Sequence, residues 1–488
     1  MKKHGTAKTF LALLLAVSLL AALFPVFAED AQEPITIDNI RNYVVGVDEP
    51  VTLADGTTRP LINFDNAATT PALKPVMDEV NEKLLMYGSI GRGFSYKSNV
   101  STEIYQATRG KVLSFVGLDP EDNTYSVFYV DNTTDGLNKL ATALINDEND
   151  IVLTTRMEHH ANDLPWRERC KAVGSKVVYA EVDELGRVIY DDLERRLQEN
   201  EVKYVSVTAA SNVTGYMPDV HRIAKLAHQY GAKIIVDGAQ IVAHRAFSML
   251  GDTPEENIDF FVFSAHKMYS PYSGGAVVGL TDVLEMHHPT FYGGGIVFLV
   301  QDSEVAYKFG AAAYEAGSPN YPGVVGLGKA IDILREVGFD NIAEHEKVLT
   351  RRMVDGLLAI DGVVVYGDTE NLDDRVGVVT FNTPEANSYE LATRISEYGG
   401  AATRRGAFCA HPYVWRLMGY ADEEMTGFEG CDDFKTPGMI RVSFGIYNTE
   451  EEVDEFLRIV REQIEVIKAH NAELNEKELW DDIMPEGY

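Results

Sequence analysis

Cysteine is scarce in this chain, which has Cys170, Cys409 and Cys431 among its 488 residues. An odd and sparse set excludes a disulfide framework, even for a protein that works outside the cell, and it leaves at least one thiol free. The neighbours of each thiol therefore decide whether it has a chemical role.

Basic residues are also outnumbered, because 43 lysines and arginines stand against 75 aspartates and glutamates, giving a formal net charge of −32. Such a chain repels nucleic acid and anionic membranes, although solubility alone would favour the same excess. We expect no nucleic-acid partner. We also expect no metal site.

Long apolar runs are confined to the N-terminus, where Lys2, Lys3 and Lys8 precede the run Phe10 to Phe24 and small residues lead up to Ala28. This pattern is typical of a secretory signal peptide cleaved after Ala28. An uncleaved anchor is the alternative, but the run is short for a membrane span. We expect residues 1–28 to be a signal peptide and the mature protein to be exported, with no membrane attachment after cleavage.

Internal repeats and low-complexity linkers are absent, and the chain instead alternates β-rich runs with helical patterns. Apolar positions in Val220 to Gly231 recur at helical spacing, and Gly231 stands where a C-cap glycine belongs. The alternation predicts an α/β fold with a mainly parallel sheet covered by helices. The clearest strands are Tyr125–Val130, Asp150–Thr155, Lys203–Thr208, Lys233–Gly238 and Asp259–Ser264.

Polar residues follow each of these five strands at once. In open parallel sheets ligands bind beyond the carboxyl ends of the strands, so we expect the five polar clusters to converge on one pocket. The clusters read DNTTDG, MEHHAND, AASNVTG, DGAQ and SAHK.

The residue types in these clusters suit a phosphorylated aromatic ligand. The turn at Asn132, Thr133 and Thr134 precedes a helix and suits a phosphate, although it is also an ordinary N-cap. Asp237 ends an apolar strand and needs a donor, which a pyridinium nitrogen or a backbone turn would supply. His159 would stack on an aromatic ring or be structural.

Lys267 follows the fifth strand, with Ser264 and His266 ahead of it. A lysine held in a partly dry pocket has a lowered pKa and becomes an amine nucleophile that can form a Schiff base. Together with the phosphate turn, the buried aspartate and the flat histidine, it describes a pyridoxal phosphate site.

With these residues, the chain resembles the class V aminotransferase-like, fold type I pyridoxal-phosphate enzymes, most closely their cysteine desulfurase and selenocysteine lyase branch. The resemblance extends from about Asn63 to Arg461. It is carried by FDNAATTP, MEHHANDLPW, SNVTGYMPDV, AHQYGAKIIVDGAQ, FVFSAHKMY, YGGG, EAGSPNYPG, FCAHP and IRVSFGIYNTEEEVD.

The resemblance implies a large domain with a seven-stranded sheet and a smaller α+β C-terminal domain. We therefore expect residues 29–84 to be an N-terminal segment that packs with the small domain. Residues 85–328 would form the large cofactor-binding domain and residues 329–488 the small domain.

It also implies a role for each residue near the cofactor. Lys267 would hold the cofactor as a Schiff base and shuttle protons, Asp237 would keep the ring nitrogen protonated and Gln240 would bond the phenolic oxygen. His159 would stack on the ring. The phosphate would be bound by Thr133, Thr134, Ser264 and His266, and, in the dimers that family members form, by Ser318 of a neighbouring subunit.

Substrate recognition follows from the same resemblance. Arg441 matches the arginine that grips the substrate α-carboxylate, since a guanidinium binds a carboxylate through two donors, with Asn212 and Arg404 nearby. The implied substrate is a small amino acid.

Cys409 lies where the desulfurase branch carries its catalytic cysteine, so the implied reaction takes sulfur or selenium from cysteine or selenocysteine, gives alanine and leaves a persulfide on Cys409. An unidentified acceptor would then take the sulfur. His411, Arg404 and Arg405 would favour the required thiolate. The alternative is a structural cysteine, joined to Cys431; Cys170 is expected to be inert packing.

Several positions depart from the family pattern. Asn132 stands where the family has glycine, which changes a backbone position that needs freedom there. Ala407 and Phe408 replace polar histidines before the cysteine, and Gly91 next to Arg92 stands where histidine is frequent. Export is a further departure. An aminotransferase, an epimerase, a C–S lyase or a non-catalytic binding protein therefore stay open as alternatives.

Overall fold

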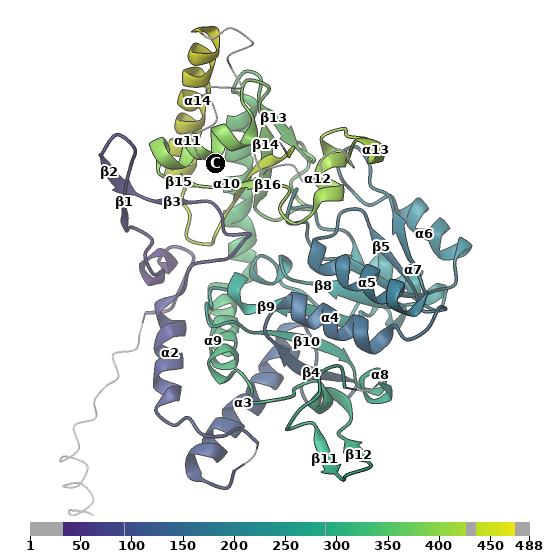
Figure 1. The fold of residues 1–488 in the computed structure, drawn as a ribbon. Coiled ribbons are helices and arrows are strands. Elements are labelled where there is room, and N and C mark those ends of the chain that lie inside the picture. Colours follow the sequence, from purple (N-terminus) through teal and green to yellow (C-terminus); the bar gives the residue numbers. More distant parts are fainter. Residues whose placement is uncertain (1–32, 92, 288, 426–435, 474–488) are drawn as a thin grey trace, which may run out of the picture. The chain divides into compact units, whose positions relative to one another are not determined.

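A computed structural model describes residues 33–91, 93–287, 289–425 and 436–473. The chain divides into two units, Met1–Ile35 and Thr36–Tyr488, and the fold described below is that of the second unit (Figure 1). The predicted signal peptide, Arg92 and Cys431 lie outside the described residues.

A seven-stranded sheet forms the centre of this unit, and β10 is antiparallel to both of its neighbours while the other pairings are parallel. The mainly parallel sheet predicted from the sequence is thus confirmed. Its strands, in spatial order, are β4 (Tyr125–Val130), β10 (Gly275–Leu280), β9 (Phe260–Ser264), β8 (Lys233–Asp237), β7 (Val202–Thr208), β5 (Ile151–Thr155) and β6 (Val177–Ala180).

Two strands of the sheet, β6 and β10, were not identified from the sequence. Strand β6 has four residues at the sheet edge, and β10 begins in a glycine-rich loop. The glycines of β10 have a packing reason, because a Cβ on Gly275 would clash with the carbonyl oxygen of Phe263, and one on Gly279 would lie 2.5 Å from the ring of Phe260. Glycine inside a strand thus marks a close approach of neighbouring groups.

Helices cover the sheet, and most follow a strand directly in the chain (Figure 1). In α7 the Asp219 side chain accepts a hydrogen bond from Arg222 N, and Gly231 just beyond the helix has φ +77°, as the sequence predicted. The helices of this part are α3 (Tyr96–Phe115), α4 (Thr133–Leu144), α5 (Leu164–Val173), α6 (Tyr190–Glu199), α7 (Val220–Gln229), α8 (Thr281–Met286) and α9 (Tyr321–Val337).

A smaller antiparallel sheet follows toward the C-terminus, in the order β13 (Val364–Tyr366), β14 (Val378–Asn382), β17 (Met439–Ser443) and β16 (Arg404–Gly406). Its core includes Phe64, Phe381 and Phe444, all fully buried. The helices of this part are α10 (Phe339–Leu358), α11 (Ser388–Gly399), α12 (His411–Leu417), α13 (Asp422–Met425) and α14 (Glu450–Glu473).

The N-terminal segment packs against elements of both parts of the fold. Strand β3 (Ile62–Asn63) pairs in parallel with β15 (Ala401–Ala402), whereas α2 (Lys74–Leu84) packs on α9. The domain boundary expected at residue 328 falls inside α9. Two hairpins complete the described strands, β1 (Pro50–Thr52) with β2 (Thr58–Pro60) and β11 (Val297–Val300) with β12 (Val305–Tyr307).

Candidate active site

One cavity of about 690 Å³ collects the side chains that follow the carboxyl ends of the parallel strands. The convergence expected from the sequence is therefore present. The predicted residues that line the cavity are Lys267, Cys409, Asp237, Gln240, His159, Thr133, Thr134, Ser264, His266, Arg441, Asn212 and Arg404.

Lys267 ends a short 3-10 helix, Ala265–Lys267, directly after β9. Its side chain is half-buried, and desolvation lowers the pKa of its amine to about 8. The negative charge of Asp237 opposes this shift, and the positive charge of Arg441 adds to it. A lysine in this environment is partly neutral near pH 7, as an amine nucleophile must be.

Asp237 closes β8 and is 3% exposed, so burial raises the pKa of its carboxyl. Its Oδ1 accepts a hydrogen bond from Ala239 N at 2.9 Å. His159 follows β5, and burial together with the nearby charge of Lys267 lowers the pKa of its imidazole to about 3. His159 is therefore an uncharged flat ring that lines the same cavity as the buried Asp237.

The N-terminus of α4 forms another wall of the cavity. Ser264 Oγ lies 2.7 Å from both Thr133 N and Thr133 Oγ1 and ties the helix start to β9. Burial lowers the pKa of His266 to about 4, so this imidazole is neutral as well. Backbone N–H groups at a helix start and neutral hydroxyl and imidazole groups form a suitable set of phosphate ligands.

Asn132 does not need the backbone freedom of glycine, contrary to the concern raised from the sequence. Its φ of −169° is extended backbone that any residue adopts, and its side chain accepts a hydrogen bond from Asp135 N at 3.0 Å. The asparagine thus adds an N-cap to α4 without disturbing the turn.

Two polar atoms in the cavity wall are buried and have no hydrogen-bond partner in the described part of the chain, Gln240 Oε1 and Arg441 Nε. Gln240 Nε2 donates to Ala67 O at 3.0 Å. Unpartnered buried polar atoms are costly unless a ligand supplies the missing bond. The donor set, the neutral His159 and the two unpartnered atoms together fit pyridoxal phosphate and an amino-acid carboxylate.

Asp65 is a contributor to this site that the sequence analysis missed. Its carboxylate lies between two arginines, 3.1 Å from Arg441 Nη2 and 3.5 Å from Arg404 Nη1. The signal was present, because Asp65 is the acidic residue that follows β3 within the FDNAATTP segment. Burial lowers the pKa of Arg441 to about 10, which Asp65 opposes.

Cys409 is exposed and stands on a turn in which Ala410 N donates to Ala407 O at 2.7 Å. Both central residues have left-handed backbones, Phe408 with φ +51° and Cys409 with φ +56°. A non-glycine residue in such a conformation costs about 1–3 kcal/mol, and the strain persists only where the surroundings hold it.

Neighbouring groups hold this turn from two sides. Asn212 Nδ2 donates to Phe408 O at 2.7 Å, and His160 N donates to Cys409 O at 2.6 Å. The rings of His160 and His411 stack at 4.9 Å and 8°, with Nδ1 of His411 3.1 Å from Nε2 of His160.

His411 does not supply the positive charge that the sequence analysis assigned to it, because burial lowers the pKa of both His411 and His160. Lys267 and Arg441 each interact electrostatically with Cys409, and Arg404 lines the same cavity. Cys170 is buried on α5 in the core of the large sheet, where it was expected to be packing. The suggested partner Cys431 lies outside the described residues.

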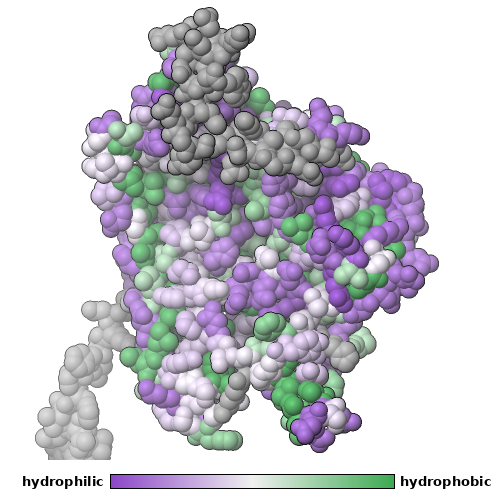
Figure 2. Space-filling view, viewed as in Figure 1, coloured by the Kyte–Doolittle hydropathy of each residue, from purple (hydrophilic) through white to green (hydrophobic). Residues whose placement is uncertain are grey.

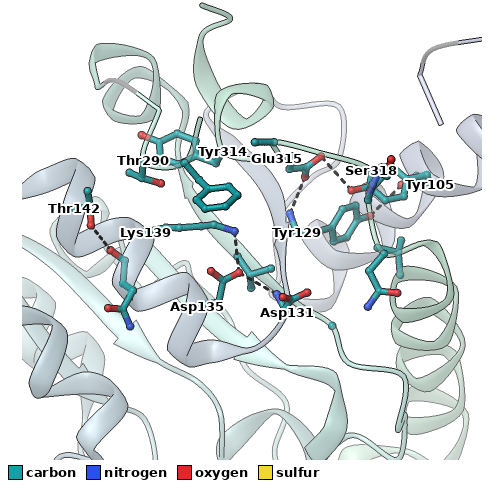
Figure 3. A pocket seen from close by; sticks show the side chains of 18 residues that line it. Tyr105, Tyr129, Asp131, Asp135, Lys139, Thr142, Thr290, Tyr314, Glu315 and Ser318 are labelled. Atoms are coloured by element: carbon teal, nitrogen blue, oxygen red, sulfur yellow. Dashed lines mark hydrogen bonds and ion pairs between the residues drawn. The ribbon is translucent and has the colours of Figure 1, made fainter. Parts of the chain in front are cut away.

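Ser318 lines a different cavity, of about 440 Å³, together with Tyr105, Tyr129 and Lys139 (Figure 3). Asp131 lines both cavities, so they adjoin at the end of β4. Within one chain, Ser318 is therefore next to the cavity that holds Lys267 but is not part of its lining. Across the described ranges, His, Cys, Asp and Glu form no cluster that could hold a metal ion.

The mainly parallel seven-stranded sheet, with a lysine, an aspartate and the start of a helix at its strand ends, defines a fold type I pyridoxal-phosphate enzyme. Residues 62–456 match the model of the aminotransferase class-V family. The chain therefore belongs to the class V aminotransferase family.

Curated relatives and solved structures are similar over most of their length. A probable cysteine desulfurase of Halalkalibacterium halodurans is 32% identical over 399 residues, 81% of this chain and 91% of the relative. A cysteine desulfurase of Haloferax volcanii is 33% identical over 409 residues, 83% of this chain and 89% of the relative. The apo structure of a cysteine desulfurase from Thermococcus onnurineus NA1 aligns with a TM-score of 0.77 at 27% identity, covering 89% of this chain and 99% of that chain. The cysteine desulfurase CsdA from Escherichia coli aligns with a TM-score of 0.73 at 25% identity, covering 89% of this chain and 100% of that chain.

Proposed function

We propose that this protein is a pyridoxal-phosphate-dependent cysteine desulfurase, which converts cysteine to alanine and keeps the sulfur as a persulfide on Cys409. One observation carries the proposal: Lys267, Arg441 and Cys409 line the same cavity. An amine for the cofactor, a cation for the substrate carboxylate and a thiol for the sulfur are the groups that this reaction requires. The similarity to proteins named cysteine desulfurases supports the same reading.

The cofactor would supply an electron sink beside the substrate α-carbon. Lys267 would hold it and carry a proton to and from the substrate, which its lowered pKa permits. Asp237 would face the ring nitrogen and His159 the ring face. The start of α4, with Ser264 and the neutral His266, would hold the phosphate.

The Cys409 thiolate would attack the sulfur of the bound cysteine. An S–S bond forms while the substrate C–S bond breaks, and the electron pair of the broken bond stays with the substrate, which takes up a proton and leaves as alanine. Selenocysteine would react in the same way at selenium. Release of the sulfur from Cys409 then needs a thiol acceptor.

The test is a product assay with purified protein and cysteine, which should yield alanine and, with a reducing thiol present, sulfide. Cys409→Ala should lower alanine release by about 100-fold or more, the scale seen when a group that touches the reacting atom is removed. Cys170→Ala, which removes a buried thiol outside the cavity, is the matched control.

Other products would select other reactions. Equal alanine release from Cys409→Ala would refute the persulfide mechanism, and a keto acid or D-amino acid in place of alanine would indicate an aminotransferase or an epimerase. Sulfide with pyruvate would indicate a C–S lyase. A protein that binds the cofactor but yields no product from any amino acid tested would be a binding protein.

We also propose that the protein works as a homodimer in which Ser318 of each chain completes the phosphate site of the other. Ser318 lines the cavity next to the one with Lys267, and its neighbours Gly317 and Pro319 line a further cavity with Val297, the first residue of the β11–β12 hairpin. Apolar side chains are exposed on this hairpin, Phe298 at 68%, Leu299 at 53% and Val300 at 62%. Figure 2 shows hydrophobic atoms gathered in this part of the surface, next to a hydrophilic tip. Large exposed apolar patches on soluble proteins mark interaction sites.

Complementation tests the shared site. Lys267→Ala and Ser318→Ala chains, each of low activity alone, should regain activity when they are mixed and allowed to exchange subunits, because one of the two sites then has both residues. A monomeric mass by light scattering, or no recovery on mixing, would contradict the shared site.

Export is the third proposal, supported by the lysines and the apolar run that precede Ala28. None of the helices in the described ranges is long and apolar enough to cross a bilayer. The mature protein isolated from its own cells should have the mass of a chain that begins at Glu29, whereas a chain that retains residues 1–28 in the membrane fraction would indicate an anchor.

A further inference from the structure

We propose that Phe408 is a positioning residue for Cys409. Its ring packs against the guanidinium of Arg441, the residue proposed to bind the substrate, and this contact holds the reactive thiol of Cys409 in place. This inference rests on the proposed desulfurase function. It concerns a residue that the sequence analysis noted as a departure, an apolar side chain directly before the cysteine.

Phe408, Asn212 and Arg441 contact one another in a closed triangle. The guanidinium carbon of Arg441 lies 5.0 Å from the centre of the Phe408 ring, Arg441 Nη1 donates to Asn212 O at 3.1 Å, and Asn212 Nδ2 donates to Phe408 O at 2.7 Å. A guanidinium over an aromatic face is attracted by the ring electrons, most strongly where both are dry. Here Arg441 is 3% and Phe408 7% exposed.

The triangle has a consequence for the neighbouring residue. Because Phe408 and Cys409 both have left-handed backbones, the turn would relax into another conformation if its anchors were lost. Phe408 is anchored at its ring and at its carbonyl, and Cys409 is the next residue, exposed toward the cavity. The position of the thiol is therefore fixed relative to Arg441.

This arrangement couples two tasks. Arg441 would bind the substrate carboxylate, and the same guanidinium contacts the Phe408 ring in the turn that carries Cys409. The position of the thiol is then fixed relative to the bound substrate. This matters because misplacement of a reacting group by about 1 Å can slow a reaction about 100-fold.

The test compares Phe408→Leu with Phe408→Tyr in the full chain with cofactor bound. Leucine keeps an apolar side chain at a left-handed position but has no ring face, whereas tyrosine keeps the ring. Persulfide on Cys409 is measured in a single turnover at saturating cysteine by mass spectrometry. Affinity for alanine, which cannot lose sulfur, is measured from the change in the cofactor absorption spectrum.

We expect Phe408→Leu to form the persulfide about 10- to 100-fold more slowly while its affinity for alanine changes less than about threefold. Phe408→Tyr should retain the rate of the parent. Phe456→Leu, the same change at a fully buried position on α14, is the control for loss of packing and should leave the rate unchanged.

Either of two results would overturn the proposal: a Phe408→Leu protein that forms the persulfide at the parent rate, or a Phe456→Leu protein that loses the rate as fully as Phe408→Leu does. If the parent protein itself forms no persulfide from cysteine, the proposed function fails. That outcome is read from the parent alone and is distinct from a failure of the Phe408 variants.

Discussion

The amine of Lys267 is expected to titrate near pH 8, and its reactivity with aldehydes checks this directly. At pH 7 an amine with a pKa of 8 is neutral in about one molecule in ten, whereas an ordinary lysine is neutral in about one in 3,000. In cofactor-free protein at pH 7, Lys267 should therefore react about 300-fold faster than an unperturbed lysine of equal access.

Two substitutions should move this pKa in opposite directions. Asp237→Asn removes a negative charge that raises the pKa of Lys267, so the amine should be neutral to lower pH and react faster at pH 7, by about tenfold at most because about a tenth is already neutral. Arg441→Gln removes a positive charge that lowers the pKa, so the reaction at pH 7 should become slower.

The assay is reductive methylation with formaldehyde, followed residue by residue by peptide mass spectrometry between pH 6 and pH 10. Lys225 serves as the internal control, because its hydrogen bond to Glu256 raises the pKa of its amine. An inflection of Lys267 at the pH of ordinary lysines, or a shift in the same direction in both variants, would refute the reasoning.

Three further predictions concern stability. Glu346→Ala should lower the free energy of unfolding by about 3–5 kcal/mol in urea titrations, because it leaves the buried His244 and the partly buried Arg245 without their shared carboxylate. Asp454→Ala at an exposed ion pair should cost less than about 1 kcal/mol. Asn132→Gly should cost only a few tenths of a kcal/mol and leave cofactor affinity unchanged, since no glycine conformation is used there, and higher affinity in the variant would contradict this. Burial lowers the pKa of His159 below its value in the unfolded chain, so below about pH 6.5 the unfolded chain binds a proton that the folded chain does not. His159 therefore lowers the free energy of unfolding increasingly as the pH falls from about 6.5 toward 3, and has no such effect at higher pH. His159→Asn should therefore lose less stability than the parent between pH 7 and pH 5, measured as the urea midpoint, and parallel losses would contradict this account.

The sequence predicted the parts of the fold that local patterns specify. Continuous apolar runs with polar ends located β4, β5, β7, β8 and β9 to within about a residue. The common direction of the parallel strands brings the polar residues that follow them to one edge, which is why Lys267, Asp237 and His159 could be placed together from the sequence alone. Strand β10 escaped because its glycines are used for close packing and weaken the strand pattern.

The charge state of the site was harder to predict than its composition. His411 follows Cys409 by two residues and suggested a cation beside the thiol. In the structure it stacks on His160, and burial lowers the pKa of both rings, so neither carries charge at neutral pH. Desolvation of these two rings depends on packing between segments that are 251 residues apart in the sequence, so no local sequence pattern predicts it.

The backbone conformation at Cys409 could not be predicted from the local sequence either. Left-handed conformation is normally signalled by glycine or asparagine, and neither occurs between Ala407 and Ala410. The strain is held by contacts from Asn212, His160 and Arg441, each of which comes from a different part of the chain. Because two of these contacts come from residues that line the same cavity, the shape of the turn depends on the integrity of the site. The thiol is therefore held in place by the groups that would bind its substrate, and changes to Arg441 are expected to alter substrate affinity and thiol position together.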